Sequence, residues 1–568
     1  MRAARLPLVL GLYALSITAG PGHQSADSSK QDTLVFRHVH VVNVGDGAIA
    51  RDHRLTIAGD RIVSIMPESA VAPIAGRVID AAGAFVIPGL WDMHQHLLEY
   101  PGVAPAAVPD AVLPLYIANG VLGVRDMGTH GFEDLARLRT DVETGKVLGP
   151  RLVITDRALD GIPPTDEIKR PIATESDARA AVRNMKAAGA DFVKVYDRLT
   201  RPVYLAVADE CRRQALPFVG HVPIAVGVRD AIAAGQRSIE HMGSGAIRRA
   251  CYAYVPEGAP PAADTDPAQT AAIIAAMNAA FDGQVDAVWR PETAQWIQSP
   301  AGRGALSVIG RDLGRIRSLR VLRRATARNG VEIAVHATHE RGERTYLLQA
   351  DAKGTLDLLP DEPDVELASQ VRELAAELRP RDVWIVPTLT PLSAIVRRQE
   401  LLAHPDAHLE FVPEDVRRAL DPKNDPRYQA WTDLEWGYMR RTYDRDAHLA
   451  AALRRLGVKM MTGTDAVTDY CLPGFGLHEE LRLLVQAGFS PLQALQASTL
   501  EPAAFLNRTK DMGTVEVGKL ADLVLLGADP VADIANAGAI RGVVRSGRYL
   551  DRAELDRLLA RVKAAVRH

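Results

Sequence analysis

The stretch GLWDMHQH (Gly89–His96) follows an apolar run and places two histidines two residues apart. In a β-strand, alternate side chains point to the same side, so His94 and His96 are expected to face the same way. Neutral imidazole is the commonest protein ligand for zinc-like ions. Paired histidines also occur on ordinary surfaces, so the meaning of this stretch depends on the segments that follow it.

The segments that follow repeat one sequence pattern. Short apolar runs, from GVLGVRDM (120–127) to KMMTGTDA (459–466), alternate with amphipathic stretches such as ESDARAAVRNMKAAGA. Alternation of this kind predicts parallel βαβ units. Seven or eight such strands favour a (β/α)8 TIM-like barrel over an open sheet. We therefore expect an α/β fold, with the barrel spanning residues 87–507.

The two ends of the chain have a different pattern. Residues 31–86 and 508–552 hold short alternating runs rich in valine, separated by glycine turns. We expect them to form one small β-sandwich domain built from both termini. Residues 243–380 break the strand–helix rhythm and are expected to be an insertion between two barrel strands. A chain of 568 residues would ordinarily suggest three or four domains, but these patterns predict two.

The first 20 residues predict a signal peptide. Arg2 and Arg5 precede an apolar run from Leu6 to Ala19, and small residues follow. The run is shorter than the ~20 apolar residues of a comfortable membrane span. We expect a periplasmic or secreted protein without a stable membrane anchor; an uncleaved anchor is the alternative.

The amino-acid composition argues against several other classes of protein. The 67 basic and 70 acidic residues nearly balance, whereas a nucleic-acid-binding protein usually has a basic excess, so no nucleic-acid partner is expected. Three cysteines without CxxC spacing argue against a disulfide framework and a thiolate zinc site. The oligomeric state, including a homo-oligomer, stays open.

Further metal-capable side chains stand at the ends of strand-like runs. Each has an ordinary alternative: a lysine that reaches solvent, a structural histidine, or a helix cap. In a barrel, however, all of these strand ends meet at the face that holds the active site. Four imidazoles, a carboxylate and a lysine carbamate formed with carbon dioxide suffice for two divalent cations about 3.5–4 Å apart. The six residues are His94, His96, Lys194, His221, His241 and Asp465.

The set of motifs resembles the amidohydrolase superfamily, in the branch near imidazolonepropionases and Xaa-Pro dipeptidases. The resemblance covers nearly the whole chain after the leader, apart from the insertion. The matching stretches are VIPGLWDMHQH, GVLGVRDMG, DFVKVYD, GHVP, SIEHM, VPTL, TGTDA, SPLQALQASTLEPAAFL and GTVEVGKLADLVLL.

The resemblance implies a ligand set for two metal ions. His94, His96, Lys194 and Asp465 would bind one ion, and carboxylated Lys194 with His221 and His241 the other. Asp465 would also take a proton from the attacking hydroxide and pass it to the leaving nitrogen. Zinc is the default ion for this ligand set, although manganese, cobalt or iron also fits.

Two positions bear on the substrate. Ile224 stands where deaminases of the superfamily carry a glutamate and some dipeptidases a tyrosine, which disfavours deamination and leaves dipeptidase activity open. Tyr196 lies two residues after Lys194, on the same side of its strand, and is the candidate substrate-binding residue. The alternative is a packed aromatic side chain. For Arg125 an ion pair with Asp126 is favoured over a contact with substrate.

His336 and His339, in HATHE, have the spacing of a helical metal site, but VEIAVH reads as a strand. They are not counted as ligands.

These inferences predict an exported binuclear metal-dependent amidohydrolase that cleaves a C–N amide bond in a peptide or N-acyl amino acid, with Asp465 as general base and acid. The substrate is expected to be a small molecule or peptide. Two alternatives remain: hydrolysis of a lactam, lactone or other non-peptide amide, and a catalytically silent metal-binding protein.

Overall fold

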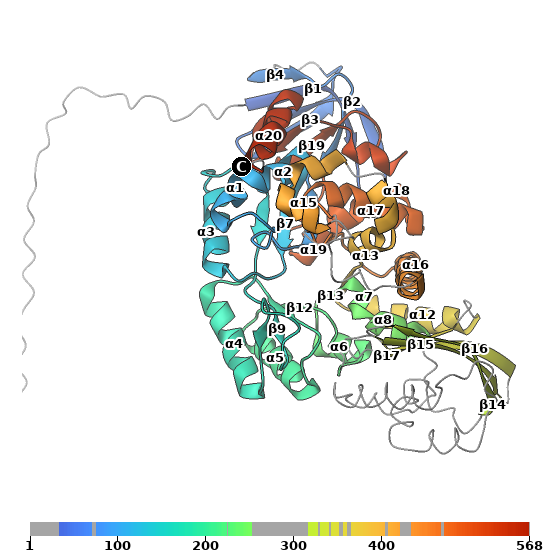
Figure 1. Ribbon diagram of the computed structural model, residues 1–568. Helices are drawn as coiled ribbons and strands as arrows, with labels where there is room; N and C mark the ends of the chain where they lie inside the picture. The colour runs from blue at the N-terminus through green and yellow to red at the C-terminus, as the bar shows by residue number, and fades with distance from the viewer. Residues whose placement is uncertain are drawn as a thin grey trace, which may run out of the picture.

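The computed structural model describes residues 33–70, 75–223, 225–252, 316–327, 330–339, 342–350, 356–360, 365–403, 407–420, 433–466 and 471–566. The expected signal peptide, at residues 1–20, lies outside these ranges. Within them, no helix combines the length and apolar character that a membrane crossing requires. Figure 1 shows the sheet formed by the two chain ends at the top of the view and helices α4 and α5 at the lower left.

The terminal sheet joins strands from both ends of the chain. The C-terminal strand β19 pairs antiparallel with β5, Leu523 opposite Pro88, so the two ends share one mixed eight-stranded sheet. β1 pairs with β4 before His38 and with β5 after it. His38 has a left-handed φ of 55°, and the β1–β2 register shifts there, as in a β-bulge. The strands are β1 (Thr33–Val42), β2 (Ile49–Ala58), β3 (Arg61–Pro67), β4 (Arg77–Asp80), β5 (Phe85–Pro88), β19 (Leu523–Leu526), β20 (Ile540–Arg545) and β21 (Arg548–Asp551).

The central strands are parallel, most of them are buried, and they form two sheets. One has three strands in the order β6 (Leu90–Gln95), β7 (Val121–Asp126) and β8 (Arg151–Val153). The other has six, in the order β10 (Arg170–Pro171), β9 (Leu159–Asp160), β11 (Val193–Val195), β12 (Phe218–Gly220), β13 (Ser238–Glu240) and β18 (Trp384–Val386). Strands followed by helices in this way establish an α/β fold.

No closed barrel is detected among the described residues, so the expected (β/α)8 barrel is not shown as one continuous sheet. β8 pairs with no strand of the six-stranded sheet, and the segment around Met460–Ala466 makes only isolated bridges, Ile385 to Met460 and Gln95 to Ala466. Hydrogen bonds connect this segment to both sheets: Met461 N donates to Ile385 O at 3.0 Å, and Asp465 N to His94 O at 2.8 Å. The ends of β6, β18 and the Asp465 segment therefore lie next to each other without a regular ladder.

Helices follow the central strands, as their amphipathic sequences predict. α4 shows the local cause: Thr174 caps its first turn in a capping box with Asp177, and Gly189 ends it in a left-handed conformation. The helices in the first half of the chain are η1 (Pro105–Ala107), α1 (Val108–Ala111), α2 (Leu113–Ala118), α3 (Phe132–Glu143), α4 (Glu175–Ala188), α5 (Arg201–Arg213), α6 (Val228–Ala234), α7 (His241–Ser244) and α8 (Ala246–Tyr252). Those in the second half are α12 (Val365–Leu378), α13 (Leu389–Val396), α14 (Arg398–Ala403), η3 (Ala407–Phe411), α15 (Glu414–Leu420), α16 (Asp433–Arg455), α17 (Phe475–Ala487), α18 (Pro491–Ser498), α19 (Leu500–Phe505), η4 (Ile534–Gly538) and α20 (Arg552–Ala565).

The region expected to be an insertion contains a sheet that its sequence did not predict. β14 (Ile316–Ala327), β15 (Gly330–His339), β16 (Gly342–Ala350) and β17 (Leu356–Pro360) pair antiparallel in chain order. They separate β13 from β18, which are neighbours in the parallel sheet. In Figure 1 these strands lie at the lower right, beside α8 and α12.

An apolar layer lies below the ends of the central strands. Phe192 and Val219 are buried in it, two residues before Lys194 and His221 on the same faces of their strands. Phe505 from α19 packs edge-on against Trp384 in the same cluster. The polar strand ends thus rest on a packed floor.

Candidate metal centre

The six predicted ligands stand at or just beyond the ends of parallel strands. His94 is in β6 and His96 follows it; Lys194 is in β11; His221 follows β12. His241 is the first residue after β13, and Asp465 follows the segment bridged to β18. The carboxyl ends of parallel strands collect at one edge, so residues as far apart in the sequence as His94 and Asp465 become neighbours.

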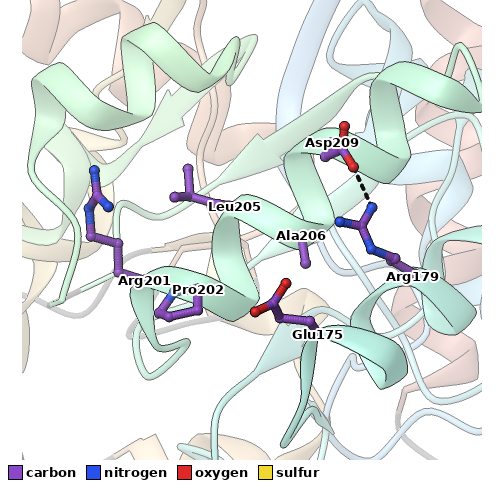
Figure 2. A pocket seen from close by; sticks show the side chains of 7 residues that line it. All are labelled: Glu175, Arg179, Arg201, Pro202, Leu205, Ala206 and Asp209. Carbon is purple, nitrogen blue, oxygen red and sulfur yellow. Dashed lines mark hydrogen bonds and ion pairs between the residues drawn. The ribbon is translucent and has the colours of Figure 1, made fainter.

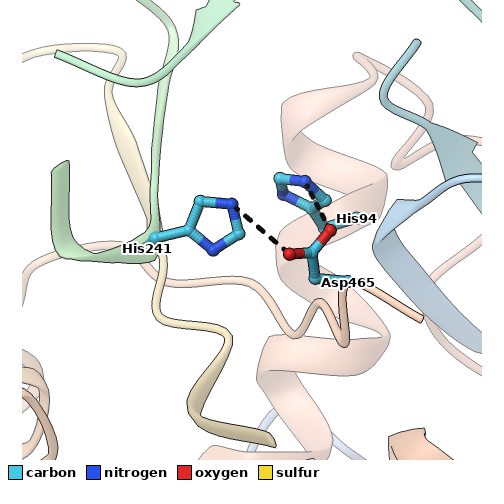
Figure 3. Close-up of side chains that lie close together, drawn as sticks. All are labelled: His94, His241 and Asp465. Atoms are coloured by element: carbon cyan, nitrogen blue, oxygen red, sulfur yellow. Dashed lines mark ion pairs between the residues drawn. The ribbon is translucent and has the colours of Figure 1, made fainter. Parts of the chain in front are cut away.

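Asp465 lies between two of the histidines (Figure 3). Its Oδ1 is 3.4 Å from His94 Nε2, and its Oδ2 is 3.8 Å from His241 Nε2. One ligand atom from each of the three residues lies within 4.8 Å of the others, a spacing that one cation can bridge. These three residues form a candidate metal group.

His96 and Lys194 join this group from either side. His96 Nε2 is 3.4 Å from Asp465 Oδ1, and Lys194 Nζ is 3.3 Å from His94 Nε2. Lys194 is 2% exposed, so its amine is buried inside the group rather than directed to solvent. A lysine that reaches water along the strand is therefore not what the structure shows.

His221 approaches from the other side, with its ring centroid 4.9 Å from that of His241. Its Nδ1 contacts Asp197 Oδ1 at 2.7 Å and Ser244 Oγ at 2.9 Å. Its Nε2 is buried and has no hydrogen-bond partner among the described residues. Because a buried polar atom without a partner is costly, this nitrogen fits a metal ligand.

The four histidines use the same ring nitrogen, Nδ1, to contact the surrounding protein. Each Nδ1 contacts a protein oxygen: Glu240 Oε2 for His94 at 2.9 Å, Gly128 O for His96 at 2.8 Å, Asp197 for His221 and Thr388 Oγ1 for His241. Partners of this kind fix ring orientation and tautomer in metal sites. The Nε2 atoms of His94, His96 and His241 are left for the centre of the group, where they face Asp465.

The protonation states also suit a metal. Burial lowers the pKa of His241 to about 3 and that of His94 well below its usual value, with further lowering by Lys194, so both rings are neutral at neutral pH. Burial acts to raise the pKa of Asp465, but His241, His96 and Lys194 lower it below its usual value, which keeps the carboxylate charged. Neutral imidazole and charged carboxylate are the forms that bind cations.

Backbone conformation at the strand ends is unusual. His241, Thr388 and Asp465 have φ values of 52°, 49° and 52°, in the left-handed region that side chains other than glycine seldom adopt. Such conformations cost of order 1–3 kcal/mol each and cluster at functional sites. Here they turn three side chains of one contact network towards each other.

Glu240 is a central residue that the sequence reasoning did not select. It is fully buried, and it binds His94 through Oε2 and the guanidinium of Arg125 through Oε1 at 2.9 Å. The signal was present in RSIEHM, where an acidic residue ends a buried strand next to His241. The favoured partner for Arg125 was therefore wrong: it pairs with Glu240, because Asp126 instead accepts the backbone N–H groups of Leu97 and Gly128.

The structure also bears on the other residues singled out in the sequence. The Tyr196 ring lies 4.0 Å from the His221 ring, at the edge of the group. Ile224 lies outside the described residues. His336 and His339 are on strand β15, so the helical spacing that would suit a metal does not apply to them.

A separate hollow of about 420 Å³ lies between α4 and α5 (Figure 2). None of the predicted ligands lines it. Two of its polar side chains pair with each other, since Arg179 donates to Asp209. It offers no metal-binding chemistry comparable to the strand-end group.

Comparisons with known proteins connect this arrangement to one family. A model of the amidohydrolase family matches residues 246–550. The imidazolonepropionase of Aromatoleum aromaticum is 39% identical over 97 residues, which are 16% of this chain and 22% of that protein. The matches to curated relatives span about a fifth of each relative's length.

Solved structures match over nearly the whole chain. The putative prolidase from Bifidobacterium longum has 20% identity and a TM-score of 0.57, covering 94% of this chain and 99% of that one. Bottromycin amidohydrolase has 19% identity and a TM-score of 0.60, covering 94% and 90%. At this identity the likeness shows a shared fold.

Proposed function

The chain belongs to the amidohydrolase family, and we propose that it is a binuclear metal-dependent hydrolase that cleaves a C–N amide bond in a peptide or N-acyl amino acid. The observation that carries the proposal is the convergence of His94, His241 and Asp465, with His96, Lys194 and His221 around them. The similar folds of a putative prolidase and of bottromycin amidohydrolase support the choice of bond.

Six residues would hold the two ions: His94, His96, Lys194, His221, His241 and Asp465. Bound there, two divalent cations, with zinc as the default, would lower the pKa of a water molecule and polarise the substrate carbonyl. The Asp465 carboxylate, held charged by its neighbours, accepts the proton of the attacking water. It then donates that proton to the leaving nitrogen. The histidines keep their orientation because their Nδ1 atoms are already bonded.

Lys194 would contribute as a carbamate formed with carbon dioxide. Burial and the nearby charge of Lys169 lower the pKa of its amine to about 8, although Asp465 and Glu240 act to raise it. A lowered pKa increases the neutral fraction of the amine, the form that reacts with carbon dioxide. The carbamate would replace a buried cation with an anion among metal ligands.

Removal of metal tests the proposal. We expect a chelator to abolish hydrolysis of a panel of dipeptides and N-acyl amino acids, and zinc with bicarbonate to restore it, since the carbamate requires both. Metal content is measured on the same samples. A metal-depleted protein that keeps full turnover would contradict the mechanism. Turnover of lactams or lactones alone would instead favour the non-peptide class.

We also propose that the protein is exported to the periplasm or secreted. The support is the basic and apolar pattern of residues 1–20. N-terminal sequencing of the protein from a producing bacterial host is expected to begin near Gly20. A chain that retains Met1 in the cell would show that the leader is not cleaved.

A further inference from the structure

Lys169 is a buried cation beside the candidate metal centre. It follows Ile168 in the connection between β9 and β10, and it is only 7% exposed. Its Nζ lies 4.6 Å from the centroid of the Tyr196 ring, and that ring in turn lies 4.0 Å from His221. The Tyr196 ring therefore lies close both to the ammonium of Lys169 and to a predicted metal ligand.

The ion pair that Lys169 makes within the described residues is a weak one. Asp166 Oδ2 is 3.3 Å from Lys169 Nζ, but the Asp166 side chain is 43% exposed. Solvent screens a carboxylate in such a position, so exposed pairs contribute little. Burying an ammonium is expensive unless an anion compensates it. A second anion next to Lys169 would provide that compensation.

The segment around Lys169 is held in place by its own contacts. Arg157 donates to three consecutive carbonyls, those of Glu167, Ile168 and Lys169, at 2.5–2.9 Å. At the other end, Asp160 accepts the backbone N–H groups of Gly161 and Thr165 at 2.9 and 2.7 Å. These contacts hold the backbone that carries Lys169, so less conformational entropy is lost when its ammonium binds a ligand.

The same clamp reaches the candidate centre. Asp160 also accepts the backbone N–H of Arg198 at 2.7 Å, next to the Asp197 that holds His221. Tyr196 N donates to Leu159 O at 2.9 Å, which ties Tyr196 to the strand before the Lys169 segment. The segments that carry Lys169, Tyr196 and His221 are thus joined by hydrogen bonds.

We propose that Lys169, with the hydroxyl of Tyr196, binds the free carboxylate of the amino acid that leaves on hydrolysis. This inference rests on the proposed function and narrows its substrates to N-acyl amino acids and dipeptides with a free C-terminus. The scissile carbonyl carbon and the carboxylate carbon of such a substrate are three bonds apart, at most about 4 Å. So short a span keeps the carboxylate beside the ligands, and Lys169 Nζ lies on the His221 side of them, 4.6 Å from the Tyr196 ring that contacts His221. Amides and esters of the same amino acids lack the anion and are expected to bind poorly.

Binding without turnover tests the inference. We would titrate the zinc-loaded Asp465→Asn protein by calorimetry with N-acetyl amino acids and dipeptides, each paired with its C-terminal amide. The acids are expected to bind roughly 10- to 100-fold more tightly than the amides, the range for a hydrogen bond to a charged group. In the Lys169→Met background this preference should disappear, whereas Lys169→Arg should keep part of it.

Lys186→Met is the matched control, because Lys186 is exposed in the last turn of α4; it should keep the full preference. Zinc content and thermal unfolding are measured for every variant, so that a misfolded Lys169→Met protein is recognised. In that case the acid-over-amide preference of Lys169→Arg tests the inference instead. Equal binding of acids and amides, or a preference that survives in Lys169→Met, would overturn the inference. Acid-selective binding by a wild-type protein that hydrolyses none of the acids would overturn the proposed function and leave the carboxylate site standing.

Discussion

Replacing Asp465 with asparagine is expected to lower kcat by about 10³-fold or more while zinc remains bound. The substitution removes the proton acceptor and donor, and general acid–base groups contribute typically 10²- to 10⁴-fold. It also removes a charged ligand, but His94, His96 and His241 keep their Nε2 atoms in place through Nδ1 contacts. The measurement is kcat on the best substrate, with zinc counted per chain.

Asparagine is the appropriate replacement because Asp465 has a φ of 52°, and asparagine tolerates the left-handed region better than most residues. Loss of activity then reflects the missing carboxylate rather than a strained backbone. The matched control is Asp134→Asn on the surface of α3, where the side chain is 49% exposed. A fully zinc-loaded Asp465→Asn enzyme with a tenth or more of wild-type kcat would exclude Asp465 as the proton shuttle.

Replacing Glu240 with glutamine is expected to destabilise the protein by about 3–5 kcal/mol, the usual cost of removing one partner of a buried ion pair. Arg125 has no exposed surface, and Glu240 is its salt-bridge partner at 2.9 Å. The same change weakens the acceptor that holds His94 Nδ1. Loss of such a partner typically lowers metal affinity 10- to 100-fold. Urea unfolding of the metal-free protein and zinc competition titrations measure the two effects separately.

Two further variants serve as controls for the effects of Glu240→Gln on stability and zinc affinity. Glu143→Gln, on an exposed position of α3, should leave both quantities unchanged. The double variant Arg125→Met/Glu240→Leu removes both charges and is expected to be more stable than Glu240→Gln, because no uncompensated guanidinium remains. Zinc affinity equal to that of the wild type in Glu240→Gln would show that Glu240 does not position His94.

The sequence pattern predicted which residues meet, because strand ends are readable from apolar runs and collect at one edge of parallel strands. It did not predict what orients them. Thr388 lies 147 residues from the His241 that it contacts, and no local pattern reveals such a pairing. The role of Asp197 as the partner of His221 was missed for another reason: in DFVKVYD it reads as an ordinary strand-end residue.

The fold shows the same limit. Alternating strands and helices predicted the α/β class, and the valine-rich ends predicted strands. Closure of a barrel depends on hydrogen bonds of segments such as Met460–Ala466, whose isolated bridges no sequence period encodes. Only VEIAVH, within β15, was read as a strand; the sheet of β14 to β17 was missed because its other segments were read together with alanine- and proline-rich neighbours as an irregular insertion.

The pairing of β19 with β5 has a consequence for the order in which the chain acquires its structure. β5 is made early in synthesis, yet the strand that covers its edge is made only after the entire central region. Until then β5 presents an open edge, the kind of surface on which chains aggregate. A chain truncated before Leu523 would keep that edge exposed permanently. The edge of β5 is therefore covered only once β19 has been synthesised and has paired with it.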